Sequence, residues 1–136
     1  MKVDQFRISN SRIVYSKKNI TVPDEASFVM LFTSRANLEN PFWLTLISAE
    51  YPDVKVISCS TSGEIYDQEI TDDSISGIAV RMEHTPVAIR NVKINDRGNS
   101  WEAGRTLASE LSKEDLKYVF LVSVGWEVNG TELING

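Results

Sequence analysis

Short apolar runs and polar stretches alternate along the chain from residue 27 onward. Residues 28–32, 54–59 and 118–122 are mostly apolar or β-branched and have the length of strands. Continuous hydrophobicity over such a short run is typical of a strand that is covered on both faces. In residues 78–82 the apolar positions alternate, which predicts a half-buried strand. Residues 87–94 are expected to return beside it as the second arm of an antiparallel hairpin.

Two helices are expected between these strands. The first is apolar on most sides, so we expect it to be deeply buried. It begins either with Asn37 as its cap or with Asn40 as its cap and Pro41 in the first helical position. The second helix begins after Asn99 or Ser100, either of which can cap it.

The order of the elements is strand, helix, strand, hairpin, helix, strand. This order predicts an α/β fold with a mixed, partly parallel sheet that is flanked by helices and includes an antiparallel hairpin. Residues 4–8 and 12–15 predict two further short strands ahead of this array. With 136 residues, we expect a single domain over residues 1–136.

Composition and charge exclude several classes of function. The chain has 14 Lys and Arg against 19 Asp and Glu, so it lacks the basic surface that nucleic-acid binding requires. No apolar run approaches the length of about 20 residues that crosses a membrane. Cys59 is the only cysteine, which excludes an internal disulfide and fits a reducing, cytoplasmic location. With His84 as the only histidine, zinc sites built on cysteine pairs and His-rich metal sites are excluded as well.

The polar loop that follows the strand at residues 54–59 is the first candidate binding site. In open α/β sheets, ligands bind beyond the carboxyl ends of the strands. Backbone amides and hydroxyls there can surround a small polar ligand, and Glu64 can receive its cationic group. The alternative is a tight turn whose Ser and Thr side chains bind their own backbone. The candidate ligand-binding residues of this loop are Cys59, Ser60, Thr61, Ser62, Gly63 and Glu64.

A second polar stretch follows the apolar run at residues 118–122. Gly125, Asn129 and Gly130 are its candidate ligand-binding residues. Asn129 is a good helix cap, and backbone amides at the start of such a helix favour an anion, including a ligand carboxylate. The alternative is an ordinary capping motif.

Catalysis and metal binding have weaker support in the sequence. A nucleophilic Cys59 would need a nearby base and a lowered pKa, and His84 is remote in the sequence, so an inert buried thiol is expected. We therefore predict no catalytic residues and no resident metal. His84 is expected to be solvated at the tip of the hairpin, with a role as a haem ligand as the alternative. The acidic stretch 67–73 matches no calcium-binding loop, so a solvated loop is expected there.

Two segments resemble the landmarks of the FIST domain, and the resemblance covers residues 27–136. The run Val56–Ile65 is similar to the family's hallmark, in which a strand leads into Cys-Ser-Thr-Ala-Gly-Glu-Ile, with Ser62 here in place of the alanine. Residues 119–133 resemble the second landmark, a hydrophobic strand that leads to an Asn-Gly-Ser-Glu-Leu helix start. Val124 stands where the family commonly has an aspartate before the glycine.

The resemblance implies a function and a set of partners. FIST domains are viewed as intracellular sensory domains of signal-transduction proteins, proposed to bind small ligands such as amino acids. It therefore implies a non-catalytic domain whose two polar loops contact a small ligand and whose output is a downstream signalling protein or domain. One branch of the family is associated with haem and nitric-oxide sensing, and that role and a Cys59-dependent enzyme are the alternatives. Family members are longer than this chain, so we expect an N-terminal portion whose exposed apolar edge favours homo-oligomers.

Overall fold

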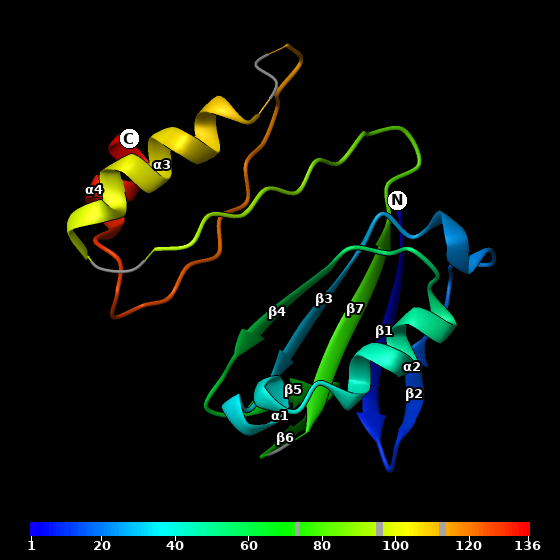
Figure 1. Cartoon of the computed structure of the whole chain (residues 1–136). Helices are drawn as coiled ribbons and strands as arrows, with labels where there is room; N and C mark the ends of the chain where they lie inside the picture. Colours follow the sequence, from blue (N-terminus) through cyan, green and yellow to red (C-terminus); the bar gives the residue numbers. More distant parts are fainter. Residues whose placement is uncertain (73, 95–96, 112–113) are drawn as a thin grey trace. The chain divides into compact units, whose positions relative to one another are not determined.

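The computed structural model describes residues 1–72, 74–94, 97–111 and 114–136. Its contacts divide the chain into two compact units, Met1–Val87 and Ala88–Gly136 (Figure 1). Each unit is described by itself below. The expectation of one domain over the whole chain stays a prediction.

The first unit is built on a five-stranded sheet. Its strands are β1 (Lys2–Ser9), β2 (Arg12–Lys17), β3 (Phe28–Thr33), β4 (Val56–Ser60) and β7 (Ile75–Arg81), in the order β2-β1-β7-β3-β4. β3 and β4 pair in parallel, and the other neighbours are antiparallel. The structure thus confirms the predicted α/β fold with a mixed, partly parallel sheet. The antiparallel hairpin of this sheet is β1–β2, from the two N-terminal strands that the sequence also predicts.

A single turn of helix, η1 (Pro23–Glu25), precedes β3. Two short helices then connect β3 to β4. α1 spans Arg35–Glu39 and α2 spans Phe42–Glu50, so the prediction of one helix that begins at Asn37 or Asn40 is wrong. Ser34 caps α1, and Pro41 is the cap of α2 rather than its first helical residue. The proline ring has no N–H to donate and would clash with a carbonyl of the preceding turn, so the helix is interrupted there.

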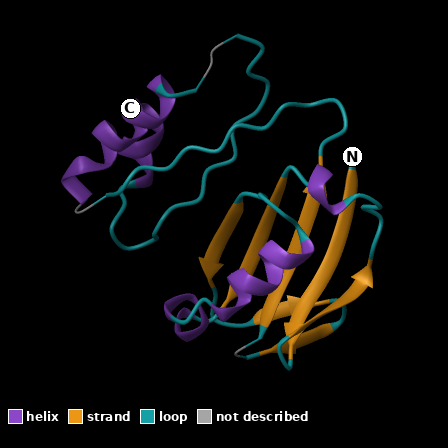
Figure 2. Cartoon of the chain, turned by 45° about the vertical axis from the view of Figure 1, so that its right-hand side comes forward, coloured by secondary structure: helices purple, strands orange, loops and turns teal. Residues whose placement is uncertain are grey.

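The core of this unit lies between α2 and one face of the sheet (Figure 2). Trp43, Ile47 and Tyr51 come from α2 and its end, and they pack on residues of β1, β3 and β7. β7 is a central strand buried on both faces rather than the half-buried strand that we expected. Its Gly77 allows the close approach of neighbouring side chains, because an added Cβ would lie 2.5 Å from a ring atom of Phe6.

A second, two-stranded sheet follows β4. β5 (Glu64–Tyr66) and β6 (Glu69–Thr71) pair antiparallel, so the stretch that we expected to be a polar loop contains a small hairpin. The hairpin that we expected at residues 78–94 is wrong, because residues 87–94 form no strand. An extended segment becomes a strand only where a neighbouring backbone pairs with it. Within the acidic stretch 67–73, Asp73 lies outside the described residues.

Helices are the only regular secondary structure in the described part of the second unit. After the short turn η2 (Arg97–Asn99) come α3 (Ser100–Ser109) and α4 (Gly130–Asn135). α3 and α4 pack closely, since a Cβ on Gly104 would collide with the carbonyl oxygen of Leu133. None of the helices within the described ranges is long and apolar enough to cross a membrane.

The strand predicted at residues 118–122 is wrong for this structure. Tyr118 to Val122 are irregular, and their side chains are between 44% and 81% exposed. The apolar pattern does predict the tendency to extend, but the described part of the second unit offers no other strand with which the segment could pair.

Candidate functional site

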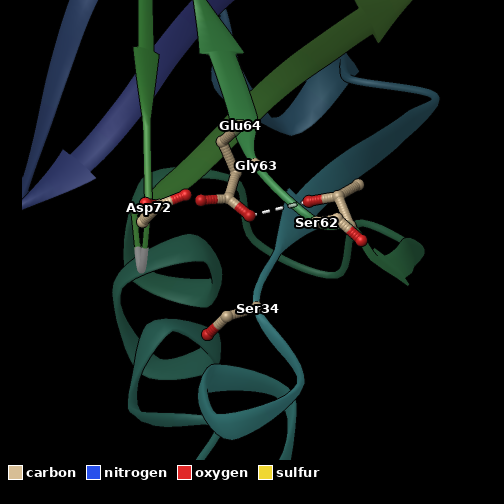
Figure 3. A pocket seen from close by; sticks show the side chains of 6 residues that line it. Ser34, Ser62, Gly63, Glu64 and Asp72 are labelled. Atoms are coloured by element: carbon tan, nitrogen blue, oxygen red, sulfur yellow. Dashed lines mark hydrogen bonds between the residues drawn. The ribbon is translucent and has the colours of Figure 1, made fainter.

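A hollow lies at the carboxyl ends of the two parallel strands, β3 and β4. Its volume is about 360 Å³. The segments that leave the two strands supply part of its wall, and the β5–β6 hairpin supplies the rest (Figure 3). The hollow is lined by Ser34, Thr61, Ser62, Gly63, Glu64 and Asp72. Its position agrees with the general rule that ligands of α/β sheets bind at this end of the strands.

The backbone of β3 and β4 fixes the position of the loop. The amide of Thr61 donates to the carbonyl of Thr33 at 2.9 Å, which extends the parallel pairing one residue beyond β4. Gly63 then has a φ of +156°, a backbone conformation that residues other than glycine rarely adopt. The chain turns at this glycine and delivers Glu64 into the base of the hairpin.

Glu64 is the central side chain of the hollow, and it is only 2% exposed. Its Oε1 accepts from the Thr61 hydroxyl at 2.7 Å, a bond that Figure 3 marks with a dashed line. Its Oε2 accepts from the amide of Ser74 at 3.1 Å and from the Ser74 hydroxyl at 3.3 Å. No Lys or Arg among the described residues forms an ion pair with Glu64. A carboxylate so deeply buried usually has a cationic partner, so a positively charged ligand group is the natural complement.

The rest of the lining is acidic or carries hydroxyls. Asp72 lies on the same wall, since its Oδ1 is 3.8 Å from the position that a Cβ on Gly63 would take. Ser34 and Ser62 add hydroxyl groups, which can both donate and accept. Because the described residues that line this hollow include no basic side chain, it suits an ammonium or hydroxyl group better than a phosphate or carboxylate.

A second hollow lies at the tip of the hairpin and is lined by Arg7 together with residues 66–69. The guanidinium of Arg7 lies over the Tyr66 ring, 5.3 Å from its centroid, and donates to Glu69 at 3.2 Å. The cation of this hollow therefore already has a carboxylate partner. The first hollow, whose buried carboxylate lacks a cation, is the better candidate for a ligand.

The structure brings together four of the predicted site residues, Thr61, Ser62, Gly63 and Glu64. Cys59 and Ser60 lie within β4 and do not line the hollow. The other three predicted residues, Gly125, Asn129 and Gly130, belong to the second unit.

Those three residues lie at the approach to α4. Gly125 lies in an exposed turn, and Gly130 is the first residue of α4. The side chain of Asn129 caps that helix by accepting from the amides of Thr131 and Glu132. The expected cap is thus confirmed, whereas a role for these residues in ligand binding stays a prediction.

Two residues of the hollow, Ser34 and Asp72, were not among the predicted site residues. Ser34 directly follows β3, so the rule that predicts the loop after β4 could also have found it. Asp72 lies eight positions after Glu64 in the sequence. It reaches the hollow only because the intervening residues fold back as a hairpin, a contact that spacing alone does not predict.

The geometry argues against the two alternative chemistries. Burial raises the pKa of the Cys59 thiol, which disfavours the thiolate that a nucleophile needs. His84 is exposed in the bend after β7 and lines neither hollow, so its described surroundings give no support to a role as a haem ligand. Among the described residues, no group of three or more His, Cys, Asp and Glu side chains could hold a metal ion.

Comparison with known proteins identifies the family of the segment that forms this hollow. A model of the FIST N domain matches residues 27–136, a range that begins just before β3 and includes the whole hollow. No curated protein and no solved structure matches the chain. FIST domains are in general sensory domains of signal-transduction proteins. Because the match covers most of the chain, with β3, β4 and the loop that carries Glu64, the chain belongs to the FIST N domain family.

Proposed function

We propose that this chain senses a small ligand for signal transduction, and that the ligand binds in the hollow at the ends of β3 and β4 through a cationic group. The proposal depends mainly on one observation. Glu64 is a buried carboxylate that faces a hollow and pairs with no Lys or Arg among the described residues. An ammonium group would supply the missing charge and donate to the carboxylate and to the hydroxyls around it.

The lining narrows the class of ligand. An amino acid would present its ammonium group to Glu64 and Asp72, but its carboxylate would meet no basic side chain among the described lining residues. Amines without a carboxylate should therefore bind at least as well as amino acids. Ligand binding would be read by a downstream signalling protein or domain in the cytoplasm. We also propose that the sensor associates with further copies of itself.

The experiment is a thermal-unfolding screen with three matched sets of compounds. The sets are amino acids, the corresponding amines that lack the carboxylate, and the N-acetyl amino acids that lack the cation. A ligand at a hundred times its Kd stabilises the folded state by about 2.7 kcal/mol, which raises the Tm by roughly 10 °C for a domain of this size. We expect such shifts from the first two sets only.

Two variants with the same chemical change locate the binding. Asp72→Asn removes a charge from the hollow, and Asp67→Asn removes a charge from the exposed hairpin turn. Asn tolerates the positive φ of 55° at residue 67, so this control should fold normally. We expect only Asp72→Asn to weaken the shift. If no amine stabilises the chain, the proposed ligand class is wrong; if both variants respond alike, the proposed location in this hollow is wrong.

A further inference from the structure

The β5–β6 hairpin is attached to the rest of the first unit by few contacts. It forms its own two-stranded sheet, and its cross-strand pair Ile65 and Ile70 is 69% and 76% exposed. In the half of the hairpin near its turn, only Tyr66 is buried. The hydroxyl of Tyr66 donates to the carbonyl of Val14 at 3.1 Å. A hairpin of two three-residue strands is not stable alone. Its closed position must therefore depend on polar contacts with the rest of the unit.

Arg7 contacts Tyr66 and Glu69 at the tip of the hairpin, and three further contacts converge on Glu64 at its base. One oxygen holds Thr61, on the chain that enters the hairpin, and the other holds Ser74, on the chain that leaves it. Ser74 is held further by the hydroxyl of Thr33, which donates to its carbonyl at 2.6 Å, and its own hydroxyl lies 2.6 Å from that of Thr71. A single buried carboxylate thus joins the two ends of the hairpin to each other, and Thr33 at the end of β3 bonds to the backbone of both ends.

We propose that Glu64 is a latch and that the hairpin opens and closes on it as a unit, independently of the five-stranded sheet. Opening would expose the Tyr66 ring but little other apolar surface, because Ile65 and Ile70 are already exposed. Segments of this kind open at a much lower free energy than the whole fold.

The latch links the hairpin to the ligand site, because the same carboxylate lines the hollow. Oε1 accepts one hydrogen bond and Oε2 accepts two, so a ligand cation at Glu64 would share the carboxylate with the donors Thr61 and Ser74 and weaken their hold on it. Ligand binding and hairpin opening are therefore coupled equilibria. The coupling of hairpin opening to ligand binding rests on the proposed function. The opening and closing of the hairpin on Glu64 does not require a ligand.

The test is amide hydrogen exchange of the full chain without ligand. Glu64→Gln leaves one acceptor oxygen for the donors of Thr61 and Ser74. It also removes the negative charge that strengthens these hydrogen bonds. We expect amides of residues 65–71 to exchange about tenfold faster, with amides of β1, β3 and β7 changed by less than about twofold. Asp67→Asn, the matched change outside the latch, should leave the hairpin within about twofold of the parent.

A milder variant covers the case in which Glu64→Gln does not fold. Thr61→Val keeps the shape of the side chain and removes one donor, so hairpin exchange should rise about threefold by the same criterion. The proposal is overturned if hairpin and sheet amides accelerate together, if the hairpin does not respond, or if its amides are unprotected in the parent chain. None of these outcomes depends on the amine screen, so the latch and the proposed ligand class can fail separately.

Discussion

The most direct test of how the first unit is held together is the substitution Tyr51→Phe. Asp4 is fully buried beneath α2, and its Oδ1 accepts from the amides of Asn19 and Ile20 at 2.6 and 2.8 Å. Its Oδ2 accepts from the hydroxyl of Tyr51 at 2.8 Å. The substitution keeps the fully buried ring and removes only this donor. One oxygen of a buried carboxylate is then left without a hydrogen bond from any described residue.

The expected cost follows from that geometry. A hydrogen bond to a charged group contributes about 1.5–3 kcal/mol, and loss of the donor leaves the acceptor desolvated. No cavity term is added, because Phe fills nearly the same space as Tyr. Tyr15→Phe should cost less, about 0.5–1.5 kcal/mol. Tyr15 is half-buried, and Glu50, which it contacts at 2.7 Å, keeps the ammonium of Lys18 as a partner.

The measurement is urea unfolding of the full chain, followed by far-UV circular dichroism and by tryptophan emission. Trp43 reports on the first unit, since it is buried in the core, and coincidence of the two signals tests two-state behaviour. Tyr118→Phe is the matched control, because Tyr118 is 81% exposed and should tolerate the change within about 0.5 kcal/mol. If Tyr51→Phe costs no more than this control, the Asp4 carboxylate does not depend on Tyr51 and the reasoning is wrong.

Three further predictions follow from the fold. Burial raises the pKa of Tyr15 and Tyr51 above the ordinary value, so the unfolded chain loses these protons near pH 10 while the folded chain keeps them. Unfolding free energy should therefore fall above about pH 10, by up to about 1.4 kcal/mol per pH unit for the fully buried Tyr51 and by less for the half-buried Tyr15. Urea titrations should show a shallower slope for Tyr51→Phe. Gly77→Ala should cost about 1–3 kcal/mol in the same assay through overpacking, whereas Gly130→Ala, with open space around the added Cβ, should be nearly neutral; equal effects would contradict the packing argument. Deletion of residues 1–26 should abolish cooperative thermal unfolding, because it removes β1 and β2 and leaves β7 without one of its two neighbours. A soluble, cooperatively melting product would show that residues 27–136 suffice.

The sequence predicts the parts of this fold that depend on local pattern. The continuous apolar run of β3 and the β-branched residues of β4 identify the parallel pair, and the segment between them must then cross over as a helix. The same logic predicts the loop after β4 as the candidate site, and four of its six predicted residues line the hollow. Pro41 is compatible with two outcomes, since proline favours the first position of a helix and also cannot continue one; the structure shows the second, with α1 ending before it.

The sequence fails where structure depends on a distant partner. Residues 118–122 have the composition of a buried strand, yet they are exposed and unpaired in the described structure. The strands of the β5–β6 hairpin have three residues each, which is shorter than a pattern of alternation can detect. Asp72 depends on that hairpin to reach the hollow, so it could not be predicted before the hairpin itself was known.

The two buried carboxylates of the first unit show why position, rather than residue type, separates structure from function. Asp4 is sealed in the core, lines neither hollow, and accepts from two backbone amides that hold the loop before η1. These two amide donors cannot withdraw without unfolding of that loop, so the role of Asp4 is structural. Glu64 is almost as buried, but it faces open volume and two of its donors are hydroxyls that can rotate away. A ligand can compete for Glu64 at the cost of a local rearrangement, which is the property that a sensory site requires.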